Sequence, residues 1–134
     1  MLAMKSFSAF ILGVLAALIP AIMIFNLVYA RGLDVITVLL AAVGTIYMGT
    51  ALIDGRIGIL LKEAIWGVVF TLLALLGWWY SPLLLALGWL MHAVGNLVRL
   101  WSKKEPVIRA KGFIWGCLAF DIVLFLITMY AYIL

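Results

Sequence analysis

Most of this chain consists of apolar runs that are long enough to cross a lipid bilayer, separated by short polar connections. A spanning helix needs about 20 mostly apolar residues, because it rises about 1.5 Å per residue across a core about 30 Å thick. Four runs meet this requirement, and the one that begins at residue 59 continues to residue 101, which makes it about twice as long as one span. Ser81-Pro82 divides that segment, since proline ends one helix and fits the first turn of the next. We therefore predict five spans, at residues 7–30, 34–54, 59–80, 82–101 and 112–134.

The overall composition excludes a soluble protein. Of the 134 residues, 69% are hydrophobic and 10% are charged, whereas soluble domains carry about 25% charged residues. The excess apolar surface must face lipid, so residues 1–134 are predicted to form a single all-α transmembrane bundle. Its basic residues lie in short connections rather than on one broad face, and nucleic-acid binding is therefore not expected.

The distribution of lysine and arginine predicts how the chain is oriented. With five spans, the amino terminus and the 54–62 and 99–111 connections lie on one side of the membrane. That side carries every basic residue except Arg31, namely Lys5, Arg56, Lys62, Arg99, Lys103, Lys104, Arg109 and Lys111. Basic residues mark the cytoplasmic side. We predict a multi-pass protein of the bacterial inner membrane, with its amino terminus in the cytoplasm and its carboxyl terminus outside.

Small residues predict where helices touch. Lipid gives apolar helices no hydrophobic drive to associate, so their association depends on close packing of the backbones, which small residues allow. They recur at every fourth position in three runs: Ala9, Gly13, Ala17 and Ala21; Ala41, Thr45 and Gly49; and Gly112 and Gly116. This pattern favours packing within the bundle, with dimerisation as the alternative. At the proposed start of the second span, Asp34 is expected to cap the helix.

Two ionisable residues fall near the middle of the membrane. His92 lies about nine residues from the inner end of the fourth span, and Asp121 lies about nine residues into the fifth, which is roughly 14 Å deep in each case. A carboxylate at this depth costs at least about 2.5–3.5 kcal/mol, so it seldom faces lipid. We expect Asp121 to pair with His92. Asn96 and Arg99 continue the polar line towards the inner surface, where Glu63 is at a suitable level to pair with Arg99.

This polar line has two interpretations. The hydrogen-bonded pairs could serve only to fix helix register, or they could form a small pocket that binds an ion or headgroup or passes a proton. No metal site is predicted, because the candidate ligands are too few: His92, Asp121 and Glu63. Cys117 is interpreted as apolar filling. The sequence names no cofactor.

The same region resembles a family of small, uncharacterised bacterial integral membrane proteins. Their pattern has a glutamate opening one helix, then GWxxHxxWDxxHH, then a cysteine and an aspartate four residues apart. The matching residues are Glu63, Gly88, Trp89, His92, Cys117 and Asp121. The WD pair is replaced here by Gly95 and Asn96, and the paired histidines by Arg99 and Leu100. The resemblance implies the helix pattern and the position of a polar site, and the replacements lower the expectation of metal chemistry.

The leading functional hypothesis is a non-enzymatic membrane protein with an intramembrane polar site, acting as a ligand-binding or transport-related module or as an accessory subunit of a membrane complex. The alternative is a membrane enzyme that acts on a lipid-soluble substrate with His92 as general base. Besides the bilayer itself, the predicted partners are a second copy or a larger complex. Anionic lipid headgroups are expected at Arg99, Lys103, Lys104, Arg109 and Lys111.

Overall fold

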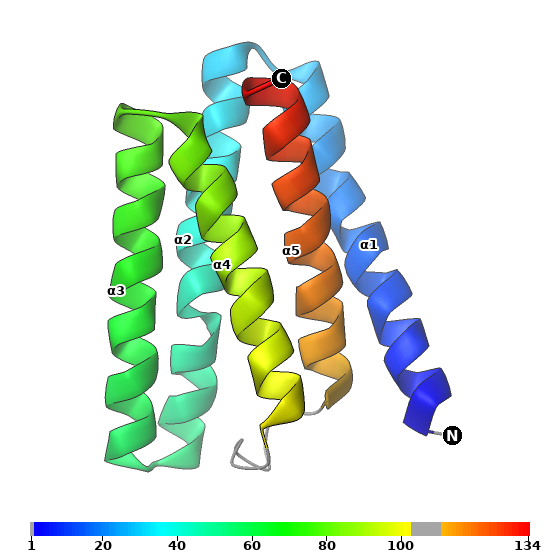
Figure 1. Cartoon of the computed structure of the whole chain (residues 1–134), viewed down its shortest axis with the longest axis vertical. Coiled ribbons are helices and arrows are strands. Elements are labelled where there is room, and N and C mark those ends of the chain that lie inside the picture. Colours follow the sequence, from blue (N-terminus) through cyan, green and yellow to red (C-terminus); the bar gives the residue numbers. More distant parts are fainter. Residues whose placement is uncertain (1, 103–110) are drawn as a thin grey trace.

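Five antiparallel α-helices make up the structure, a computed structural model that describes residues 2–102 and 111–134, with side chains from residue 6 onward (Figure 1). The helices are α1 (Leu2–Asn26), α2 (Tyr29–Asp54), α3 (Ile57–Trp79), α4 (Pro82–Trp101) and α5 (Lys111–Tyr132). All five are long and apolar enough to cross a membrane. The prediction of an all-α bundle with five candidate spans is confirmed.

The boundary between the first two helices differs from the prediction. α1 ends at Asn26 and α2 begins at Tyr29, so only Leu27 and Val28 connect them. The side-chain amide of Asn26 donates to the carbonyl of Ile22 at 2.8 Å, and Val28 is extended. No glycine or proline marks this break, and its two connecting residues are apolar. The sequence therefore gave no clear signal for its position.

Asp34 is consequently not the cap of α2, and that prediction was wrong. It lies inside the helix, in the second turn after Tyr29. Its Oδ1 accepts a hydrogen bond from Trp78 Nε1 of α3 at 2.9 Å, and its Oδ2 lies 3.8 Å from Arg31 Nη1. Asp34 therefore ties α2 to α3 near the membrane surface.

The other tight turns follow their sequence signals. Gly55 ends α2 in the left-handed conformation, with a φ of 74°, which glycine adopts at little cost. Arg56 and Asp54 form an ion pair beside it at 2.7 Å, and this hydrogen bond raises the pKa of Arg56 above its usual range. At the other turn, Pro82 opens α4 while Ser81 Oγ accepts from the backbone N–H of Leu83 at 3.3 Å.

Helix α5 packs against both α1 and α4, while α2 packs mainly against α3. The two termini lie at opposite ends of the bundle (Figure 1). We use "the basic end" for the end that carries Arg56, Lys62, Arg99 and Lys111, where the chain also begins. The α1–α2 and α3–α4 turns lie at the opposite end, together with the carboxyl terminus.

Small residues bring α1 and α5 into backbone contact, which agrees with the prediction that they pack within the bundle. A methyl group added at Gly13 would overlap the carbonyl oxygen of Gly116 and lie 3.0 Å from Ala119 Cβ. On α2 the prediction holds only in part. Thr45 lies against Gly67 of α3, but a methyl group added at Gly49 would have no neighbour within 4 Å. The glycine of α2 that does contact α3 is Gly44, which lies against Phe70.

Candidate functional site

The intramembrane site begins with a hydrogen bond between α4 and α5. His92 Nδ1 lies 2.7 Å from Asp121 Oδ2, and the two side chains are 1% and 0% exposed. The antiparallel course of the two helices brings them to the same depth, as the sequence predicted. A mid-membrane carboxylate therefore has a partner that can neutralise it.

Asn96 extends the site by one turn of α4. Its Nδ2 donates to Asp121 Oδ2 at 2.7 Å, and its Oδ1 accepts a hydrogen bond from the Tyr47 hydroxyl of α2. These two contacts fix the orientation of the amide, because a flipped amide would place its oxygen against a carboxylate oxygen. An ionised Asp121 carboxylate can only accept hydrogen bonds, so in that state Nδ1 of His92 carries the proton and donates it to Oδ2. Side chains of α2, α4 and α5 are thus joined by one set of hydrogen bonds.

A second buried pair connects this network to the basic end. Arg99 Nη2 donates to Glu63 Oε2 of α3 at 2.9 Å, and the two side chains are 9% and 2% exposed. The Arg99 guanidinium also lies over the Tyr47 ring, 4.2 Å from its centroid. This is a favourable cation–π position. We call His92, Asn96, Asp121, Tyr47, Arg99 and Glu63 the polar network.

Aromatic rings enclose the imidazole. Tyr47 stacks on His92 with centroids 6.0 Å apart, and the edge contact of Phe70 with His92 has centroids 5.0 Å apart. Trp89, one turn away on α4, is completely buried. The enzyme hypothesis requires a cavity that reaches His92. With His92 1% exposed, a substrate has no route to the imidazole in this conformation.

Some hydrogen-bonding capacity in the network is unused within the described part of the chain. His92 Nε2 and Asp121 Oδ1 are buried and have no hydrogen-bond partner there, and the same is true of Trp89 Nε1. An unprotonated Nε2 is an acceptor, so it can take up a proton while Asp121 balances the charge. The described residues contain no group of three or more His, Cys, Asp and Glu side chains that could hold a metal ion.

The structure brings together all five residues that the sequence singled out, His92, Asn96, Asp121, Glu63 and Arg99. It adds Tyr47, which the sequence analysis did not single out, because tyrosine is common at membrane interfaces as well as in buried sites. Its place seven residues before Asp54, well inside an apolar span, was the available signal. Cys117 is half-buried and lies one turn before Asp121.

The basic connection can be compared with the structure only at its two ends. Arg99 is buried, with its charge paired inside the bundle, and Lys111 is exposed at the start of α5. Lys103, Lys104 and Arg109 lie outside the described residues. Headgroup binding at all five stays a prediction.

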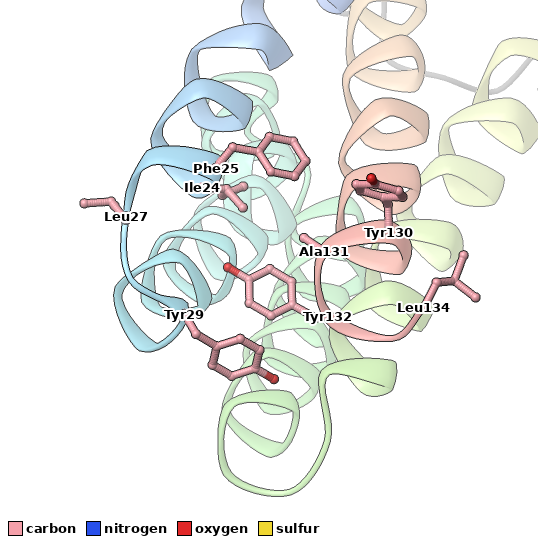
Figure 2. A pocket seen from close by; sticks show the side chains of 8 residues that line it. All are labelled: Ile24, Phe25, Leu27, Tyr29, Tyr130, Ala131, Tyr132 and Leu134. Carbon is pink, nitrogen blue, oxygen red and sulfur yellow. The ribbon is translucent and has the colours of Figure 1, made fainter.

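Aromatic residues line a hollow of about 460 Å³ at the end opposite the basic end (Figure 2). Tyr132 of α5 and Tyr29 of α2 make an edge contact with centroids 4.9 Å apart, and Phe25 and Tyr130 make another at 6.1 Å. The tyrosines at positions 29, 130 and 132 gather at one level, as expected for an interfacial belt.

Comparison with known proteins returned no match: no family model, curated protein or solved structure is similar to this chain. The resemblance seen in the sequence therefore stays a prediction, and the candidate site rests on the geometry of the polar network.

Proposed function

We propose that this is a non-enzymatic, transport-related membrane module whose intramembrane site binds a proton at the His92–Asp121 pair. The observation that carries the proposal is the completely buried pair at 2.7 Å, with acceptor capacity left at His92 Nε2. Ionisable residues within a membrane commonly mark ion and proton pathways. A proton needs no cavity, so it is a ligand that fits a site enclosed by Tyr47 and Phe70.

The polar network also supports a direction of access. Glu63, Arg99, Tyr47, Asn96 and the His92–Asp121 pair follow one another from the basic end to the middle of the bundle. Under the positive-inside rule this end faces the cytoplasm of a bacterial cell, so protons would enter from the cytoplasmic side of the inner membrane. An accessory role in a homo-oligomer or a larger complex is compatible with this module. A membrane enzyme with His92 as general base would first need an opening at Phe70.

His92 is the only histidine in the chain, so a single label reports on the site. Protein made with nitrogen-labelled histidine, placed in lipid nanodiscs, is followed by NMR as pH is varied. We expect the signals to move from neutral imidazole to imidazolium. Asp121→Asn should abolish this change while the fold persists, because a buried imidazolium without a counter-charge is too costly.

Thr128→Ala is the matched control, since it alters a buried side chain of the same helix whose hydroxyl donates to the carbonyl of Leu124 within α5. It should titrate as the wild type does. Imidazole signals that do not respond to pH in the wild type, combined with a loss of detergent stability in Asp121→Asn, would instead assign the pair to helix register alone.

A further inference from the structure

A groove of about 510 Å³ opens between α3 and α4, and Arg99 is the one member of the polar network that lines it. Its walls are mostly apolar and come from both helices: Trp66, Phe70, Leu90, Met91, Val94 and Val98. Its end at the basic end of the bundle is different, because Lys62 and Arg99 line it there. The groove is thus amphipathic along its length, with cations at the membrane surface and apolar walls towards the membrane interior.

Gly95 explains why the groove exists. α3 and α4 follow each other in the chain but contact each other less extensively than α4 contacts α5. Gly95 faces the groove, and a methyl group placed there would meet only Arg99 Nη1, at 3.2 Å. The missing side chain therefore leaves α4 backbone exposed as the floor of the groove.

The cationic end has capacity for an anion. Arg99 carries five N–H donors, and the structure pairs its Nη2 with Glu63 at 2.9 Å. Its Nε is buried, whereas its Nη1 lies beside Gly95 at the groove, 3.2 Å from a methyl group placed there. Lys62, one residue before Glu63, is exposed at the same level. Two cations against one carboxylate leave a net positive charge at this end of the groove.

We propose that the groove binds one anionic phospholipid from the leaflet at the basic end. Its phosphate is held by Lys62 and Arg99, and one acyl chain lies along the groove towards Phe70. From Lys62 to Phe70 the helix rises about 12 Å, which accommodates much of an acyl chain. A guanidinium and an ammonium together suit phosphate oxygens. Trp66 lies between the two regions, at a level where indole rings are favoured.

The test measures which lipid remains bound. The full chain is equilibrated with mixed micelles containing equal amounts of phosphatidylglycerol and phosphatidylcholine, and native mass spectrometry records the lipid retained. We expect one phosphatidylglycerol to be retained in preference. Lys62→Gln should lower the ratio of phosphatidylglycerol to phosphatidylcholine about 5-fold, since one basic residue near the surface contributes about 1 kcal/mol. Arg56→Gln removes the same charge from an exposed residue outside the groove and should leave the ratio unchanged.

The groove itself is tested by filling it. Gly95→Leu should eliminate the retained lipid, whereas Gly49→Leu, at an exposed glycine with no neighbour within 4 Å, should keep it. Val98→Trp, at an exposed lining position, provides a second block if Gly95→Leu does not fold. Equal retention of the two lipids by the wild type would overturn the proposal. So would equal effects of Lys62→Gln and Arg56→Gln, or lipid retention that survives both blocks.

Discussion

At the scale of single residues, the cost of burying charge was the most informative rule. It predicted that Asp121 would turn towards His92 and Glu63 towards Arg99, and both pairs are present. The same rule could not find Tyr47, because a phenol is neutral and is common at membrane surfaces as well as in cores. Its hydrogen bond to Asn96 depends on how α2 packs against α4, which spacing within one helix does not reveal.

Tyr47→Phe should lower the free energy of unfolding by about 1 kcal/mol, because it leaves the buried Oδ1 of Asn96 without its donor. Unfolding in mixed micelles with increasing sodium dodecyl sulfate, followed by circular dichroism, measures this loss. Tyr29→Phe is the matched control, since Tyr29 is 60% exposed. An equal loss in both variants would show that Tyr47 acts only through its ring.

Glu63→Ala should destabilise the protein by about 3 kcal/mol, because it leaves the Arg99 guanidinium buried without its carboxylate. Adding Arg99→Leu should recover most of that loss, because the uncompensated charge is then gone. The same unfolding assay applied to the single and double variants gives their coupling. Losses that simply add would argue against a paired interaction.

At the scale of helices, the sequence located every apolar helix but not every end. Ser81-Pro82 gave the correct turn between α3 and α4, because proline has a steric reason to stop a helix, and the predicted end of the second span at residue 54 agrees with the end of α2 before Gly55. The α1–α2 turn was misplaced, because its two connecting residues, Leu27 and Val28, are as apolar as the helices beside them. Small-residue spacing correctly marked contact faces on α1 and α5, although it did not pair the two helices, and it also included Gly49, which faces outward. The spacing of small residues shows which of them share a face of a helix. Whether that face contacts another helix depends on where the neighbouring helix lies.

Gly13→Ala should weaken the bundle by about 2 kcal/mol, because the added methyl group overlaps the carbonyl of Gly116 and must separate α1 from α5. The same substitution at Gly49 meets no neighbour within 4 Å and should be neutral or slightly stabilising, as alanine is the better helix former. Unfolding curves of the two variants make the comparison. A neutral Gly13→Ala would mean that the two helices are not in backbone contact.

At the scale of the whole molecule, five antiparallel helices place the termini at opposite ends, and the basic residues of the described chain, with the exception of Arg31, gather at one of them. The positive-inside rule converts this asymmetry into an orientation. Alkaline phosphatase, which is active only outside the cytoplasm, should be active when fused after Leu134 and inactive when fused at Gly55. The reverse pattern would invert the orientation and move the proposed proton entry to the outer surface.

The central claim is that one imidazole and one carboxylate meet inside the membrane and share a proton between Nδ1 and the acid. The most direct measurement is the nitrogen NMR spectrum of His92, the single histidine, in lipid at a pH where it is neutral. We predict a protonated Nδ1 with a strongly deshielded proton, which Asp121→Asn shifts to a weaker hydrogen bond. A spectrum with the proton on Nε2, unchanged by Asp121→Asn, would contradict the account.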